Sequence, residues 1–151
     1  MNDGVILLAE DRPERADLFV RILRMGGITN EVIVARDDVE TLDYLFADGE
    51  HAGRDDRLMP RLAILDLNIP RAGALETLRR LRADERTALL PIVVFSASGE
   101  ERDMLEAYRL GANAYVDKRS SVPFPEMVRR TARFWLTVNQ LPPVLVSPTP
   151  R

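Results

Sequence analysis

Five short apolar runs alternate along the chain with five amphipathic stretches, and this alternation limits the possible folds more than any other feature. The runs show no regular polar alternation, which is typical of strands buried on both faces of a parallel sheet. They are Val5–Ala9, Val32–Ala35, Leu62–Leu65, Ile92–Phe95 and Ala114–Val116. Strands that alternate with helices through short connections form right-handed βαβ units. The sequence therefore predicts an α/β fold with a doubly wound, five-stranded parallel sheet between two layers of helices.

The stretches between the runs place apolar residues at helical spacing. Pro13 suits the first turn of the first predicted helix, and Gly26 is a typical residue to end it. The predicted helices cover about Pro13–Met25, Asp38–Phe46, Ala74–Arg82, Glu100–Leu110 and Pro125–Leu136. The polar stretch Asp48–Arg61 is expected to be a surface loop.

Composition excludes several classes of function. The 151 residues carry a formal net charge of −3, so the basic excess of a nucleic-acid-binding protein is missing. The absence of cysteine excludes disulfides, thiolate catalysis and cysteine-ligated zinc. The apolar run near the N-terminus is too short for a membrane span or a typical signal peptide. We expect a cytoplasmic protein with one domain over residues 1–136. Residues 137–151 include four prolines and are predicted to form an extended or disordered C-terminal extension, too short for a DNA-binding module.

The residues that directly follow the apolar runs, most of them polar, lie at the edge where ligands bind in such sheets. They are Glu10 and Asp11, then Asp66, then Ser96 and Ala97, and finally Asp117 and Lys118. Each of these residues alone could simply cap a turn or helix. Together, clustered carboxylates repel each other unless a cation neutralises them, and hard oxygen ligands favour Mg²⁺. Lys118 is the only lysine among 21 basic residues, and a lysine cannot simply be exchanged for an arginine. A carboxylate nucleophile, a divalent cation and a lysine are the components of an aspartyl-phosphate site.

Four segments around these positions resemble the response-regulator receiver domain of two-component signalling. They read ILLAED over 6–11, LDLNIPR over 65–71, VFSA over 94–97 and GANAYVDK over 111–118. The resemblance extends over about residues 5–136 and implies a flavodoxin-like sheet with strand order 2-1-3-4-5. The DLN-x-PR segment and the ending FWLTVNQLP over 134–142 resemble the small single-domain regulators of phytochrome histidine kinases.

The resemblance implies that Asp66 is the phosphoacceptor, which attacks the phosphohistidine of a kinase. Asp11 would bind Mg²⁺ directly, and Glu10 would act mainly through a coordinated water. Asp66 and the backbone carbonyl of Asn68 would complete the protein ligands. The cofactor expected from the resemblance is therefore Mg²⁺.

The remaining site residues would bind the phosphoryl group and report its presence. Lys118 would pair with Asp66 at rest and with a phosphate oxygen after transfer. Ser96 and the Ala97 amide would bind other phosphate oxygens, and the Tyr115 side chain would follow Ser96. The added charge of about −1.5 to −2 could pull this loop inward and change a surface.

The resemblance also implies partners. The chain would take its phosphoryl group from a separate sensor histidine kinase of the phytochrome type, and it would be a signalling phosphoacceptor that catalyses only its own phosphorylation and dephosphorylation. The helix over 125–136 carries more large apolar residues than one buried stripe needs. We therefore expect a homodimer through the helix at 100–110, the strand at 114–116, the helix at 125–136 and the C-terminal extension. The alternative is that the extension folds back over its own subunit.

Three positions depart from the family pattern. Arg119 follows Lys118 where a proline with a cis peptide is usual, and a non-proline cis bond costs about 3–4 kcal/mol. We therefore expect a trans bond or a strained loop. Ala74 replaces a usual glycine, with Gly73 one place earlier, which predicts a shifted turn. Arg12 replaces a small polar residue and is expected to point to solvent rather than to the phosphate.

Three other functions compete with this interpretation. A haloacid-dehalogenase-like phosphatase would need a second aspartate where Asn68 stands, and a cap domain. A nucleotide-binding protein would need a glycine-rich phosphate loop after the first strand, which is missing. A receiver-like module that acts by protein contacts alone is the serious alternative. The intact Asp66 and Lys118 argue against it, and Arg119 is the one feature in its favour.

Overall fold

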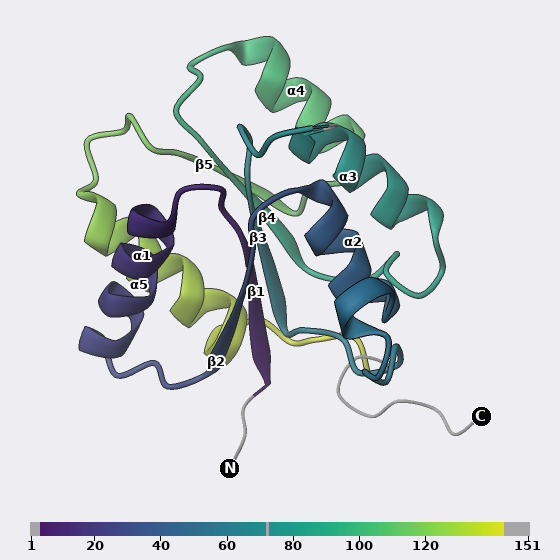
Figure 1. Cartoon of the computed structure of the whole chain (residues 1–151). Coiled ribbons are helices and arrows are strands. Elements are labelled where there is room, and N and C mark those ends of the chain that lie inside the picture. Colours follow the sequence, from purple (N-terminus) through teal and green to yellow (C-terminus); the bar gives the residue numbers. More distant parts are fainter. Residues whose placement is uncertain (1–3, 72, 144–151) are drawn as a thin grey trace.

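The central sheet has five parallel strands in the order β2-β1-β3-β4-β5, which confirms the predicted fold (Figure 1). The strands are β1 Val5–Ala9, β2 Glu31–Ala35, β3 Leu62–Asp66, β4 Ile92–Ser96 and β5 Ala114–Asp117. The structure, a computed structural model, describes residues 4–71 and 73–143. Strands β3, β4 and β5 each run one residue further than predicted, so Asp66, Ser96 and Asp117 are strand residues.

Five helices cover the two faces of the sheet, with α1 and α5 on one side and α2, α3 and α4 on the other (Figure 1). They are α1 Pro13–Met25, α2 Asp38–Phe46, α3 Gly73–Ala83, α4 Glu101–Arg109 and α5 Phe124–Arg133. Two apolar clusters hold the three layers together. One packs the α1 and α5 face against residues such as Ile6 and Phe95, and the other packs the α2 and α3 face against Leu7 and Leu65. Apolar burial on both faces explains why the inner strands lack polar alternation.

The two edge strands differ from the prediction of full burial. Strands β1, β3 and β4 are almost completely buried, whereas every residue of β5 is only partly buried and β2 is exposed at two of its five positions. An edge strand has a neighbour on one side only, so solvent reaches part of it. The uninterrupted apolar runs indicate strands correctly but overstate their burial at the edges.

The C-terminal end of α5 also differs from expectation. The predicted single helix changes after Arg133 into a π-helical turn, η2, over Phe134–Val138. Arg61 donates a hydrogen bond from Nη2 to the Leu136 carbonyl at 3.3 Å, which supplies one partner for this turn. Within the predicted extension, Leu141 is only 6% exposed and therefore packs on its own chain, while residues 144–151 lie outside the described part.

The turn into α3 lies where Gly73 allows it. Gly73 has φ +83° and begins the helix one residue before the predicted start, so the expected shift of this turn is found. Arg71 is also left-handed, with φ +71°. Glycine adopts positive φ without steric cost, whereas a residue with a Cβ is strained there.

No helix among the described residues has the length and apolar composition needed to cross a bilayer.

Candidate phosphoacceptor site

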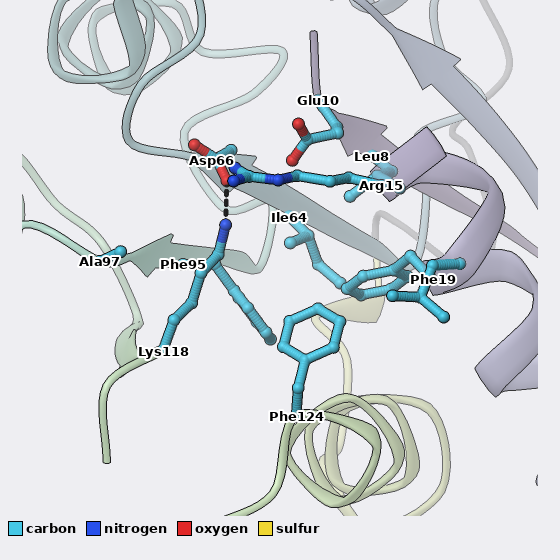
Figure 2. Close-up of a pocket in the computed structure, with 11 residues that line it drawn as sticks. Leu8, Glu10, Arg15, Phe19, Ile64, Asp66, Phe95, Ala97, Lys118 and Phe124 are labelled. Carbon is cyan, nitrogen blue, oxygen red and sulfur yellow. Dashed lines mark hydrogen bonds and ion pairs between the residues drawn. The ribbon is translucent and has the colours of Figure 1, made fainter. Parts of the chain in front are cut away.

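A pocket of about 360 Å³ opens at the carboxyl edge of the sheet, between β1, β3, β4 and the helices α1 and α5 (Figure 2). Its walls are mainly apolar and include Leu8, Leu18, Phe19, Ile64, Phe95 and Phe124. Ala97 and four charged side chains complete the lining: Glu10, Arg15, Asp66 and Lys118. An apolar cavity with a few convergent charged groups is the usual form of a binding or reaction site.

Asp66 lies at the C-terminal end of β3 with a side chain that is almost completely buried. The backbone N–H of Asn68 donates to Asp66 Oδ1 at 2.9 Å, and the Lys118 ammonium forms an ion pair with Asp66 Oδ2. The Lys118 backbone N–H donates to the Ser96 carbonyl at 2.8 Å, which fixes the start of the β5–α5 loop beside β4. Both oxygens of the carboxylate are therefore oriented, and its charge is compensated by the lysine.

Glu10 is buried in the same pocket, 6% exposed, but it has no basic side chain as a direct partner. The Arg12 backbone N–H donates to Glu10 Oε1 at 3.2 Å. Burial, followed by the negative charge of Asp66, raises the pKa of Glu10 from 4.5 to about 7; the hydrogen bond from Arg12 and the charge of Lys118 oppose this only in part. Ionisation of Glu10 is thus disfavoured in the resting site, because Lys118 compensates the two carboxylates only in part.

The other predicted metal ligands are not gathered in the pocket. Asp11 is exposed and is not one of the lining side chains, and Asn68 is exposed as well. No group of three histidine, cysteine, aspartate or glutamate side chains poised for a metal occurs among the residues that the structure describes. The donor set nevertheless fits a hard cation, because two neighbouring carboxylates, Glu10 and Asp66, repel each other and offer oxygen ligands.

Ser96 and Tyr115 lie behind the pocket rather than on its surface. Ser96 is 1% exposed, and its Oγ accepts a hydrogen bond from the Ser98 N–H at 3.0 Å. Ala97, the next residue, lines the pocket. Tyr115 stands opposite Val94 in the β4–β5 pairing, and its partly buried ring packs against the apolar cluster under α3 and α4. The β4–α4 loop would have to rearrange for the Ser96 hydroxyl to enter the pocket.

The two arginines that depart from the family pattern have separate partners. The Lys118–Arg119 bond is trans, as one of the two expectations stated. Arg119 pairs with Asp117 at 3.2 Å, and a Cβ added to Gly99 would clash with its guanidinium, which therefore packs on the β4–α4 loop. Arg12 points to solvent, as expected, where it pairs with Glu14 at 3.0 Å.

Sequence reasoning missed Arg15 and the apolar wall of the pocket. Arg15 follows Asp11 by four residues and extends from α1 along the pocket, with its guanidinium toward Asp66 (Figure 2). A signal was available, because the first turn of a helix that follows a strand must lie near the carboxyl edge of the sheet. The direction of the side chain, however, depends on the rotation of α1.

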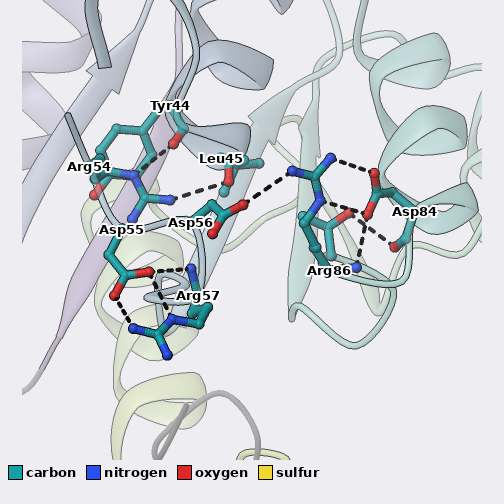
Figure 3. A network of polar contacts seen from close by, with 9 residues as sticks. Tyr44, Leu45, Arg54, Asp55, Asp56, Arg57, Asp84 and Arg86 are labelled. Atoms are coloured by element: carbon teal, nitrogen blue, oxygen red, sulfur yellow. Dashed lines mark hydrogen bonds and ion pairs between the residues drawn. The ribbon is translucent and has the colours of Figure 1, made fainter. Parts of the chain in front are cut away.

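A polar network at the opposite edge of the sheet takes no part in this pocket (Figure 3). Arg54 donates from Nε to the Tyr44 carbonyl at 2.7 Å and from Nη2 to the Leu45 carbonyl at 3.2 Å, and it stacks 4.3 Å from the Tyr44 ring centre. Arg86 pairs with Asp84 and Asp56. These contacts order the long α2–β3 connection, which was expected to be a loop and contains one 3₁₀ turn, Gly49–His51.

Comparisons with known proteins agree with this architecture. The family profile of the response regulator receiver domain matches residues 6–128. The response regulator Rcp1 of the cyanobacterium Synechocystis is 32% identical over 139 residues, which cover 91% of this chain and 92% of Rcp1.

Two solved structures superpose over nearly the whole chain. One is the phosphorylated cyanobacterial phytochrome response regulator RcpA, with a TM-score of 0.83, 31% identity, and coverage of 92% of this chain and 98% of RcpA. The other is the Mn²⁺-bound form of Rcp1, with a TM-score of 0.82, 31% identity, and coverage of 92% and 99%. On the match over residues 6–128 and this shared fold, the chain belongs to the response regulator receiver domain family.

Proposed function

We propose that the chain accepts a phosphoryl group on Asp66 from the phosphohistidine of a separate sensor histidine kinase and signals through protein contacts. The observation that carries this proposal is the setting of Asp66. It is a buried carboxylate at a strand end, oriented by the Asn68 amide, paired with the only lysine of the chain and open to a pocket. A purely structural ion pair would have no need of an adjoining pocket.

In the proposed transfer, one carboxylate oxygen of Asp66 forms a bond to phosphorus while the bond between phosphorus and the histidine nitrogen breaks. The imidazole keeps the electron pair of that bond, and Asp66 becomes an acyl phosphate. The acyl phosphate carries about −1.5 to −2 of charge in place of the single negative charge of the carboxylate, so the Lys118 ammonium would move from the carboxylate to a phosphate oxygen. The Ser96 hydroxyl and the Ala97 amide would bind other phosphate oxygens, and Tyr115 would follow Ser96 inward.

Glu10, Asp11, Asp66 and the Asn68 carbonyl are the residues that would hold the divalent cation, which we propose to be Mg²⁺. When bound, this cation neutralises carboxylate charge and orients the phosphoryl oxygens. The raised pKa of Glu10 supports the assignment, because a bound cation would relieve the repulsion that raises it. Replacing Asp11 by alanine should abolish Mg²⁺ binding in a calorimetric titration, and unchanged affinity would exclude Asp11 as a ligand.

A phytochrome-type kinase is the partner that we propose, acting in the cytoplasm. The support is similarity along the whole domain to Rcp1 and to RcpA, which is a phytochrome response regulator. Phosphotransfer profiling of purified histidine kinases against this chain would test the assignment. Preferred transfer from a kinase of another sensory class would contradict it.

We further propose homodimerisation through the α4–β5–α5 face, with help from the C-terminal extension. Exposed apolar side chains support this surface: Met104, Leu105 and Tyr108 on α4, and Phe134 and Val138 in η2. Leu141 is buried on its own chain, so Val138 is the exposed large apolar side chain that the described part of the extension, residues 137–143, offers for pairing. Sedimentation should show a shift toward monomer for Leu105→Glu and for a chain without residues 144–151. An unchanged mass in both would refute this interface.

The decisive experiment for the phosphoacceptor is Asp66→Asn. Wild-type protein should take up one alkali-labile phosphoryl group from acetyl phosphate in a Mg²⁺-dependent reaction, and the nearly isosteric amide should abolish it while leaving the fold intact. Full labelling of the variant at another residue would overturn the assignment. If the wild-type protein neither takes up the label nor binds beryllofluoride, the chain acts by contacts alone.

A further inference from the structure

Arg15 is the one charged side chain of the pocket to which the family pattern gives no role. It shares the lining with Glu10, Asp66 and Lys118, and Figure 2 shows it approaching from α1, while Lys118 approaches from β5. The inference below rests on the proposed function and deepens it.

The position of Arg15 is not explained by the stability of the helix or by pairing. It stands in the first turn of α1, where the helix dipole disfavours a cation. Across residues 4–71 and 73–143, its guanidinium has no hydrogen bond or ion pair, although Arg12 in the turn before it pairs with Glu14. Asp11, four residues earlier on the chain, is not its partner either. A cation is therefore kept free beside an acidic pocket.

Phosphorylation makes the site more negative, and Arg15 can compensate part of this charge. At rest the Lys118 ammonium compensates Asp66 directly. In the phosphorylated state an acyl phosphate with about −1.5 to −2 of charge replaces the single charge of the carboxylate, more than one ammonium can balance. Arg15 is the one further cationic side chain among the described residues that line the pocket. Its planar guanidinium offers two parallel N–H donors that match two phosphate oxygens.

We propose that Arg15 binds the phosphoryl group of phospho-Asp66 from the α1 side, opposite the approach of Lys118, and retains the phosphorylated state. The guanidinium needs no existing bond to break, because it has no partner at rest. Once in place, it also covers the mouth of the pocket, so that water reaches phosphorus less readily. Arg15 is thus a positioning residue for the phosphorylated state and not a nucleophile or a metal ligand.

The test uses the full chain with beryllofluoride, which forms a stable analogue of the phosphoryl group on an aspartate. Loss of a partly exposed charge-assisted contact should weaken beryllofluoride binding to Arg15→Ala about tenfold at saturating Mg²⁺. Arg15→Lys keeps the charge without the fork and should recover part of that loss. Arg21→Ala, which removes the same charge from an exposed position of α1 outside the pocket, should bind like wild type.

Two further measurements separate this role from indirect effects. Neither the affinity for Mg²⁺ alone nor the melting temperature should fall in Arg15→Ala, since Arg15 is neither a ligand nor part of an ion pair and its charge opposes both a nearby cation and the dipole of α1. The half-life of phospho-Asp66 should shorten in Arg15→Ala and not in Arg21→Ala.

The outcomes also distinguish this inference from the proposed function. Wild-type beryllofluoride affinity and phosphate half-life in Arg15→Ala would refute the inference and leave Asp66 as the phosphoacceptor. Equal losses in Arg15→Ala and Arg21→Ala would refute it as well, because they would indicate only a general effect of charge. A wild-type protein that binds no beryllofluoride would overturn both.

Discussion

Replacing Glu10 by glutamine should stabilise the metal-free protein above neutral pH and leave it unchanged in acid. The pKa of Glu10 is raised from 4.5 to about 7, chiefly by burial and then by the charge of Asp66. Between these values the folded state binds a proton that the unfolded state has already lost, so folding becomes less favourable as the pH rises. The rise in the pKa from 4.5 to about 7 lowers the free energy of unfolding by about 3 kcal/mol at pH values above both.

Glutamine is suited to this test because it keeps the shape of the side chain. Its Oε1 can still accept the bond from the Arg12 N–H, and its amide can donate to Asp66 as protonated Glu10 would. Only the ionisation is removed. The difference in the free energy of unfolding between the variant and wild type therefore reports the ionisation of Glu10 together with its interactions with Asp66 and Lys118, because titrating groups away from the pocket contribute equally to both.

The assay is urea unfolding in the presence of a chelator at about pH 4.5 and pH 8. The variant and wild type should have the same stability at the lower pH, and the variant should be more stable by about 3 kcal/mol at the higher one. Mg²⁺ at pH 8 should stabilise wild type more than the variant. Glu14→Gln is the control. The hydrogen bond from its own backbone N–H, followed by that from Arg12, lowers the pKa of Glu14, so removing this carboxylate should not stabilise the protein at the higher pH. A stability difference that is the same at both pH values would refute the reasoning.

Two other substitutions probe the lysine and the scaffold. Lys118→Arg keeps the charge but changes its geometry. Labelling by acetyl phosphate should therefore survive at a lower rate, while the coupling of phosphorylation to Ser96 and Tyr115 should fail. A variant that changes its oligomeric state normally on phosphorylation would contradict this. Arg82→Ala removes the donor to the carbonyls of Gly111, Thr87 and Ala88 and to Asn113 Oδ1. Urea unfolding should show a loss of about 3 kcal/mol, because the partly buried carbonyls of Gly111 and Ala88 lose their donor, and a loss below about 1 kcal/mol would show that water replaces the guanidinium.

The order of the elements and the boundaries of α1 and α2 could be predicted because they depend on local patterns. Helix α1 begins at Pro13 and ends at Met25 as expected, since proline at the first turn and glycine after the last are local signals. The π-helical turn after Arg133 could not be found in this way. It depends on contacts with distant residues, such as Arg61, whose hydrogen bond to Leu136 joins positions 75 residues apart.

In the candidate site, too, the residues at strand ends could be predicted, whereas those beyond the strands could not. Asp66 and Lys118 could be placed together because both follow directly from strand ends in a parallel sheet, and the ion pair between them needs no further information. Asp11 and Arg15 lie beyond the end of β1, where the direction of a side chain depends on the path of the β1–α1 loop and the rotation of α1. The backbone N–H of Arg12 donates to Glu10, and its carbonyl accepts the first hydrogen bond of α1. This path of the β1–α1 loop leaves Asp11 exposed and places Arg15 in the lining of the pocket. Asp66 and Lys118 thus form the half of the site that is built at rest, and the proposed function requires that the half with Asp11 and the loop with Ser96 moves when the phosphoryl group arrives. A receiver that changes its surface on phosphorylation needs this division, because a site already complete at rest would gain nothing from the phosphoryl group.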